Sequence, residues 1–264
     1  MDWWVYAYCL IASAIFLTIV FFIARRHDRY DLIDSAWGLA FIAIAAVSYL
    51  AQPSYSLISV QSLVSLLVII WGMRLSLHIY RRWNRASRED KRYMVFRQKY
   101  AKSFGGVALS MYLKIYLVQA VLAFVISLPV IIILNASEMV GFGWYVFVGL
   151  LIWLIGFYFE AVGDAQLSAF TRNHRNKGKL MTQGIWRYTR HPNYFGEAVQ
   201  WWGIATIALS VPFGWLGVIS PLTLTILLLF ISGIPLTEKY FESRSGWQEY
   251  KRKTSKFIPL PPRH

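Results

Sequence analysis

The sequence predicts an all-α polytopic membrane helix bundle of about seven transmembrane helices. Two observations carry this prediction: the composition, and the grouping of apolar residues into long runs. Of the 264 residues, 57% are hydrophobic and 15% are charged, whereas soluble domains carry roughly 25% charged residues. About 20 residues of helix cross the hydrocarbon core of a bilayer, so long uncharged runs indicate membrane spans.

Seven apolar runs follow one another along the chain, and we expect each to form a helix. They lie approximately at residues 3–24, 35–51, 57–80, 108–134, 142–163, 197–212 and 214–236. The first is too long for a signal-peptide core, and basic residues follow it, so we interpret it as a retained helix. It contains Cys9, the single cysteine, which excludes an intrachain disulfide and a thiolate cluster. We expect one domain over residues 1–264.

The basic residues predict the orientation of the chain. Of 27 Lys and Arg residues, all but Arg74 and Lys114 lie in alternate connections: 25–34, 81–107, 164–196 and the tail after residue 236. The other connections, 52–56, 135–141 and the turn near Pro212, hold none. Cytoplasmic loops carry the Lys and Arg excess. We therefore expect the N-terminus outside and the C-terminus in the cytoplasm, in a bacterial inner membrane or its equivalent. This pattern also explains the net charge of +14 without nucleic-acid binding.

Ionisable side chains within membrane spans cost at least about 2.5 kcal/mol each, so they usually face a bundle interior or a wet cavity. Asp34 lies three residues before Trp37 on one helix face, where it has either a functional role or a favourable interaction with the helix dipole. Arg74 shares a stripe with His78 in the third run. Arg74 either extends to the interface or binds a phosphate-bearing ligand.

Two carboxylates end the fifth run. Glu160 and Asp164 are four residues apart and therefore share one helix face, where two like charges are unfavourable unless something fills the gap. The hydroxyls of a ribose are one candidate. The alternative is pairing with basic residues of the following loop, namely Arg172, Arg175 or Lys179.

The most specific segment covers residues 183–203. The residue before a proline is biased away from helix, so we expect an extended His191 and a new helix from Pro192. Asn193 and Glu197 then lie one turn apart on that helix. The free N–H groups of a helix start suit an anion, and three side chains beside it would assist: Arg187, Arg190 and His191. Alternatively, Glu197 pairs with Arg187 or Arg190 and holds the loop on the bundle.

The segment RYTRHPNYFGE, residues 187–197, resembles a motif of the steroid 5-alpha-reductase superfamily of membrane reductases, in particular its bacterial branch that carried an unknown-function label. The resemblance continues through DSAW, WGMRLSLH, FEAVGDAQL, SGIPLTEK and FIPLPP and so spans nearly the whole chain. Sterol double-bond reductases and the isoprenylcysteine and phospholipid methyltransferases have similar segments on the same kind of bundle.

The resemblance implies NADPH bound between the cytoplasmic halves of the helices, mainly by residues of the C-terminal half, about 108–264. Asn193 and Glu197 would meet the nicotinamide or its ribose, and Asp164 and Glu160 would lie on the adenosine side. The remaining implied cofactor contacts are Arg74 at the pyrophosphate, Arg172 and Lys179 near phosphates, Glu238 and Tyr240 at the wall, and Tyr188, Arg190 and His191 in the motif itself.

For catalysis, the steroid-reducing members of the superfamily polarise a keto oxygen with a Gln-Glu pair and a tyrosine. This chain has no Gln-Glu pair near its second run, and the resemblance puts Asp34 in the place of the acid and Trp71 in the place of the tyrosine. We expect reduction of an activated C=C bond in an apolar lipid or steroid-like enone. The alternatives are an S-adenosylmethionine-dependent methyltransferase, whose cofactor has no phosphate and would not need Arg74, and a non-catalytic lipid-binding membrane protein.

Overall fold

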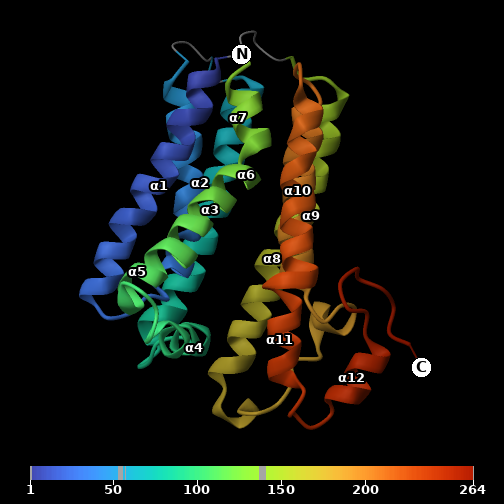
Figure 1. Cartoon of the computed structure of the whole chain (residues 1–264). Helices are drawn as coiled ribbons and strands as arrows, with labels where there is room; N and C mark the ends of the chain where they lie inside the picture. The colour runs from blue at the N-terminus through green and yellow to red at the C-terminus, as the bar shows by residue number, and fades with distance from the viewer. Residues whose placement is uncertain (1, 53–55, 57, 137–140, 264) are drawn as a thin grey trace. The chain divides into compact units, whose positions relative to one another are not determined.

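The computed structural model describes residues 2–52, 56, 58–136 and 141–263. Within these residues every regular element is a helix (Figure 1), and the one β-type pairing is an isolated bridge between Thr189 and Ser255. The all-α prediction is therefore confirmed. The expected connections 52–56 and 135–141 lie partly outside the described residues. The chain divides into two compact units, unit 1 (1–142 with 211–217) and unit 2 (143–210 with 218–264).

Unit 1 is a helical bundle that starts at the N-terminus. Its helices are α1 (Trp3–Arg26), α2 (Leu32–Leu50), α3 (Val60–Arg85), α4 (Lys91–Tyr100), α5 (Gly106–Met111), α6 (Leu117–Ile126) and α7 (Leu128–Leu134). Helix α2 packs against both α1 and α3, and α6 packs against α1. Side-chain caps fix several starts: Asp2 accepts from Trp4 N, Ser59 from Ser62 N and Asp90 from Arg92 N, each satisfying an orphan N–H of the first turn.

The closest approach of α2 to α3 is made by two glycines. A Cβ on Gly72 would lie 2.6 Å from the carbonyl oxygen of Gly38, and a Cβ on Gly38 would clash with the carbonyl of Gly72. Small residues allow helix backbones to approach in this way. The crossing brings the aromatic rings of Phe41 and Trp71 into edge-to-face contact, with centroids 5.1 Å apart.

The single helix expected over 108–134 is wrong in detail. Helix α5, a π-helical turn at Tyr112–Tyr116 and α6 run on to Ile126, and a separate helix α7 starts at Leu128. Pro129 occupies the first turn of α7, where its missing N–H costs nothing, whereas in the middle of a helix it would remove a hydrogen bond.

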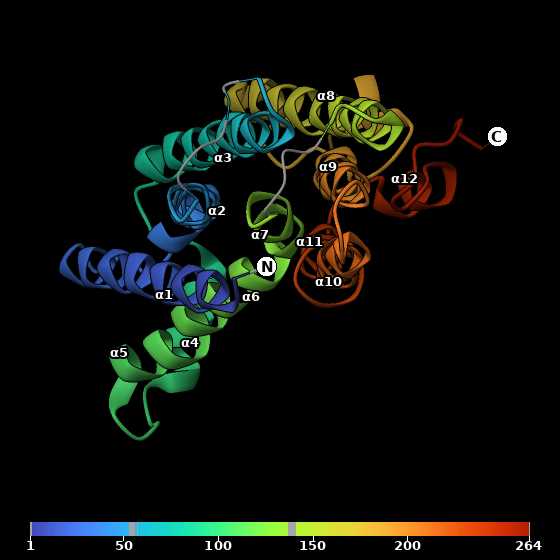
Figure 2. The same ribbon diagram turned by 90° about the horizontal axis from the view of Figure 1, so that it is seen from above.

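Unit 2 consists of α8 (Trp144–Arg172), α9 (Pro192–Ala208), α10 (Ile219–Ile226), α11 (Ile234–Phe241) and α12 (Trp247–Lys253). Helices α8 and α9 lie side by side (Figure 2) and form the main packing contact of the unit. Glycines line both sides of this contact at seven-residue spacing: Gly149, Gly156 and Gly163 on α8, and Gly196 and Gly203 on α9.

Six helical stretches of the described residues are long and apolar enough to cross a membrane: Trp3–Arg26, Leu32–Leu50, Val60–Arg85, Gly106–Ile126, Trp144–Arg172 and Gly214–Phe241. Membrane-spanning helices are thus supported by length and composition. The other expected span, 197–212, corresponds to α9, whose 17 residues lie at the lower limit of about 17 for a span. The count of seven and the orientation remain predictions.

Candidate functional site

The candidate site in unit 2 is built around the start of α9. As the sequence predicts, His191 is non-helical (φ −141°, ψ 61°) and Pro192 is the first helical residue. The preceding turn is fixed by Gly184, whose positive φ of 61° places it against the side chain of Gln166 on α8. The Trp186 indole then donates to the Gly163 carbonyl at 3.1 Å, so the segment before α9 is held on α8.

The two carboxylates of α8 meet amides of α9. Asn193 Nδ2 donates to Asp164 Oδ1 at 3.2 Å, and Gln200 Nε2 donates to Glu160 Oε2. Glu160 is 2% exposed, so it lies inside the contact between the two helices. Sequence reasoning did not single out Gln200, although an amide within the otherwise apolar run 197–212 was a signal for a buried polar partner.

Arg190, His191 and Glu238 form a second cluster. Arg190 Nε and Nη2 lie 2.9 Å and 2.7 Å from Glu238 Oε1, and His191 Nε2 lies 3.3 Å from the same oxygen. Burial lowers the pKa of His191 below its usual 6.5, although the hydrogen bond to Glu238 acts in the opposite direction. Arg190, for which pairing with Glu197 was the alternative, is therefore paired with Glu238.

Other predicted residues of unit 2 lie at or near its surface. Asn193 and Glu197 are half-buried on the first two turns of α9, and Arg172 and Lys179 are exposed in and after the last turn of α8. Tyr188 and Tyr240 are exposed, and each ring carries an arginine over it. One of these, Arg244, also donates to the Lys179 carbonyl at 2.8 Å. This bond ties the loop after α8 to the segment between α11 and α12.

Asp34, Trp71 and Arg74 belong to unit 1. Asp34 is ion-paired with Arg92 at 2.6 Å and accepts a hydrogen bond from the Tyr93 hydroxyl at 2.6 Å. Burial, and then the charge of Asp34, raise the pKa of Tyr93 well above its usual value, so this hydroxyl remains a donor. Trp71 is buried in the α2–α3 contact, and Arg74 is half-buried on α3.

Asp31 is more fully engaged than Asp34. Both its oxygens accept from Arg29 at 2.9 Å, and it also accepts from the Trp83 indole at 3.0 Å and from Asp90 N at 2.9 Å. A carboxylate with four protein donors is satisfied without a ligand. Asp31 therefore fastens the start of α2 to the connection between α3 and α4.

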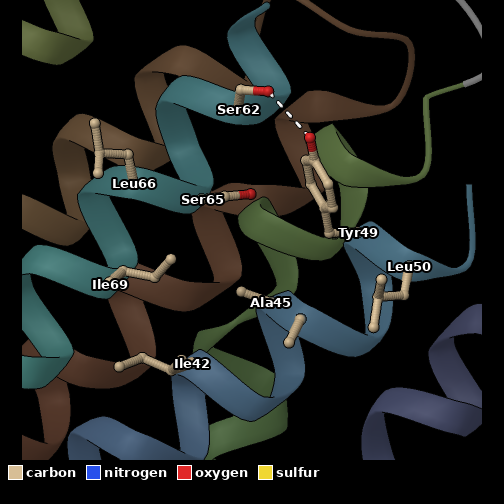
Figure 3. Close-up of a pocket in the computed structure, with 9 residues that line it drawn as sticks. Ile42, Ala45, Tyr49, Leu50, Ser62, Ser65, Leu66 and Ile69 are labelled. Atoms are coloured by element: carbon tan, nitrogen blue, oxygen red, sulfur yellow. Dashed lines mark hydrogen bonds between the residues drawn. The ribbon is translucent and has the colours of Figure 1, made fainter. Parts of the chain in front are cut away.

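An apolar cavity of about 380 Å³ lies between α2 and α3 (Figure 3). It is lined by Ile42, Ala45, Ala46, Tyr49, Leu50, Ser62, Ser65, Leu66 and Ile69. The Tyr49 and Ser62 hydroxyls are 3.3 Å apart, and the Ser65 hydroxyl points across the cavity toward Tyr49. Its size falls in the range of small-molecule pockets, roughly 300–1,000 Å³, and its walls suit a hydrocarbon ligand.

The match to a known protein family shows which family the chain belongs to. Residues 20–254 match the family described as protein of unknown function, DUF1295. The chain belongs to this family. The DUF1295 match covers nearly all of both units, including every candidate site residue named above.

Two curated proteins illustrate the relatives of this DUF1295 member. It is similar to an uncharacterized protein of Schizosaccharomyces pombe, with 24% identity over 280 residues, covering 95% of the chain and 78% of the yeast protein. It is also similar to steroid 5-alpha-reductase DET2 of Arabidopsis thaliana, with 31% identity over 78 residues, covering 29% of the chain and 28% of the plant enzyme. The family match and the match to the plant enzyme support the resemblance to the steroid 5-alpha-reductase superfamily, whereas membership of its bacterial branch stays a prediction. No solved structure matches the chain significantly.

Proposed function

We propose that this protein is a membrane reductase that uses NADPH to reduce an activated C=C bond in an apolar, lipid- or steroid-like enone. The observation that carries the proposal is the start of α9, where Asn193 donates to Asp164 of α8 and Glu197 follows one turn later, in the segment that resembles the superfamily motif. The similarity to a steroid 5-alpha-reductase supports the same reaction class. We further propose seven spans, with the candidate site toward the cytoplasm.

The donor set of unit 2 fits this cofactor. Asn193 can donate and accept, as recognition of a carboxamide or ribose requires, and the carboxylates of Glu197 and Asp164 accept from hydroxyls. Arg172 and Lys179 are exposed and supply cations for phosphates. Glu160 fits less directly, because Gln200 and the surrounding backbone enclose it. Bound NADPH would supply the hydride.

The polar residues of unit 1 provide the groups for the substrate carbonyl. Asp34 accepts from both the Arg92 guanidinium and the Tyr93 hydroxyl, and a carboxylate has no proton to donate. Tyr93, which keeps its proton, is the neighbouring donor. We therefore propose that Asp34 orients the Tyr93 hydroxyl, which would stabilise the enolate oxygen. The assignments of Trp71 to the place of the catalytic tyrosine and of Arg74 to the pyrophosphate both stay predictions. The cavity between α2 and α3 is apolar, but its lining begins at Ile42, two turns of α2 beyond Asp34, so it is kept apart from this reaction site.

Ligand-dependent thermal stability tests the cofactor class. A ligand that binds the native state raises the free energy of unfolding by about 2.7 kcal/mol at a hundredfold excess over its Kd. We expect NADPH to raise the melting temperature of the detergent-solubilised protein, NADH to raise it less, and S-adenosylmethionine to leave it unchanged. A shift with S-adenosylmethionine alone would establish the methyltransferase alternative instead.

Two substitutions then test the site. Asn193→Ala or Glu197→Gln should weaken NADPH binding roughly ten- to a hundredfold, because one charge-assisted hydrogen bond contributes about 1.5–3 kcal/mol. The matched control is Glu249→Gln on α12, which removes an exposed carboxylate paired with Lys253 in the same unit. If Glu197→Gln melts early yet binds NADPH normally, the start of α9 is scaffolding and the site lies elsewhere.

A further inference from the structure

The last residues of unit 2, Thr254–Arg263, run alongside the segment that precedes α9. We call them the C-terminal strap. Arg190 N donates to the Ser255 carbonyl at 2.9 Å, and Leu260 N donates to the Tyr188 carbonyl at 3.0 Å. The Thr189 hydroxyl donates to the Phe257 carbonyl at 2.8 Å. Three consecutive residues of the motif are thus held by residues more than sixty positions later in the chain.

The Arg190 side chain is buried between the strap, α12 and Glu238. Its guanidinium is 5% exposed, and its Nη1 donates to the carbonyls of Lys251 and Thr254 at 3.0 Å and 2.6 Å, while Nε and Nη2 face Glu238. The ring of Trp247 lies 5.6 Å from its central carbon. All three guanidinium nitrogens are therefore engaged by protein groups, and a phosphate would have to displace one of them.

Helix α12 adds a further connection on the same segment. The Tyr250 hydroxyl is buried and donates to the Trp186 carbonyl at 2.6 Å. Trp186 in turn donates to α8 through its indole. The segment 186–190 is consequently fixed on one side by α8 and on the other by α12 and the strap, and it leads within a few residues to Asn193 and Glu197.

We propose that the C-terminal strap and helix α12 together, through their bonds to Trp186, Thr189 and Arg190, position the start of α9 for cofactor binding. Arg190 is a positioning residue rather than a phosphate contact. The inference rests on the proposed function, because it concerns the site assigned there to NADPH. It differs from a purely structural role in one respect. Docking of the strap on the segment before α9 raises the affinity for the cofactor, and because such coupling is reciprocal, the bound cofactor also favours the docked strap.

Isosteric substitution tests the forward direction of this coupling. Thr189→Val keeps the shape of the side chain but removes the hydroxyl that reaches Phe257, and Tyr250→Phe removes the hydroxyl that reaches Trp186. Each should raise the Kd for NADPH about three- to tenfold in folded protein, the effect of one hydrogen bond. Thr189→Ser retains the hydroxyl and should restore wild-type binding. The Kd is measured well below the melting temperature of each variant, so that unfolding is not mistaken for weaker binding.

Limited proteolysis tests the reverse direction. Lys256 is exposed within the strap, and trypsin cleaves after it when the strap opens. Saturating NADPH should slow this cleavage in the wild-type protein by the same factor by which opening weakens binding, and should slow it less in Tyr250→Phe. The inference is overturned if the variants bind NADPH as the wild type does, or if NADPH leaves the cleavage rate unchanged. Failure of the wild type to bind NADPH would instead overturn the proposed function.

Discussion

At the scale of single residues, the carboxylates of unit 1 differ in how deeply their ion pairs are buried. The Asp34 side chain is 19% exposed and faces Arg92 and Tyr93, whereas the Asp28 side chain is 82% exposed and faces Arg97 at 2.9 Å. Solvent screens an exposed pair, so such pairs contribute about 0–1 kcal/mol. Breaking a partly buried pair leaves its partner uncompensated and costs more.

This difference predicts the result of two matched substitutions. Asp34→Asn should lower the free energy of unfolding by about 1–3 kcal/mol, because Arg92 and Tyr93 lose a charged acceptor. Asp28→Asn, in the same unit, should change it by less than about 1 kcal/mol. Denaturant or thermal unfolding of both proteins gives the comparison. Equal effects would mean that Asp34 does not fasten α4 to α2.

His191 predicts a pH dependence. Its pKa is lowered in the folded protein from the usual 6.5, so the unfolded chain binds a proton more readily than the native protein. The contribution of His191 to stability is therefore complete above about pH 6.5 and declines as the pH falls from there toward the lowered pKa.

The measurement compares melting temperatures at about pH 7.5 and pH 5.5. The wild type should lose more stability on acidification than His191→Asn, which has no ring to protonate. His174→Asn, at an exposed histidine of the same unit, is the control and should behave as the wild type. An unchanged pH response in His191→Asn would contradict the prediction.

At the scale of the helix, the α8–α9 contact depends on glycine. A Cβ on Gly156 would lie 2.5 Å from Gln200 N and 2.6 Å from the Gly196 carbonyl, and a Cβ on Gly203 would lie 2.6 Å from the Gly149 carbonyl. These neighbours are backbone atoms, which cannot move aside by a change of rotamer. The same close approach places Asp164 within reach of Asn193 and Glu160 within reach of Gln200.

Replacing these glycines by alanine should lower stability, although in a helix alanine is usually more favourable than glycine. In open space, Gly→Ala within a helix gains about 1 kcal/mol. At Gly156 the clash should outweigh this gain and lower stability by about 1–3 kcal/mol, the typical cost of overpacking. Gly143→Ala, at the N-cap of α8 with nothing within 4 Å of its Cβ, is the control for added bulk and should cost less than about 1 kcal/mol, because it loses only the preference of an N-cap for glycine over alanine. A stable Gly156→Ala protein would show that α8 and α9 can separate.

Some elements could be predicted from the sequence because their signals are local. Hydropathy along a run predicts a span, and Pro192 predicts the start of α9, since both depend on neighbouring residues. The pairing of Gln200 with Glu160, and of Arg190 with Glu238, depends on the register between helices far apart in the chain. That register is set by the glycine contacts and the C-terminal strap. The break before α7 was missed because its Pro129 lies within a continuous apolar run.

At the scale of the whole molecule, the distribution of Lys and Arg along the chain predicts its orientation in the membrane. Every candidate site residue of unit 2 lies in or beside the basic connections, and the alternate connections carry no Lys or Arg. The single domain expected over residues 1–264 stays a prediction beside the two compact units. So does the orientation, which follows from the excess of Lys and Arg in cytoplasmic loops.

Reporter fusions test this orientation. Fusions in 52–56 and 135–141 should report an outside location, and fusions in 81–107 and 164–196 a cytoplasmic one, because the basic residues oppose translocation. Moving charge provides a control: added lysines in 135–141 should weaken the outside signal. Cytoplasmic accessibility of the unmodified 135–141 connection would contradict the predicted orientation.

The π-helical turn at Tyr112–Tyr116 has a consequence for insertions and deletions. A π turn accommodates one residue more than the α-helical turn it replaces, and here it precedes α6 without ending the helix. Tyr116 leaves this turn fully buried and donates to the Tyr30 carbonyl at 2.8 Å. Deleting one residue from a regular α-helix rotates one half by about 100° relative to the other, whereas deleting Lys114 would convert the π turn to an α turn and leave the two halves in nearly the same orientation. A one-residue deletion should therefore be tolerated better in this turn than elsewhere in the same helix.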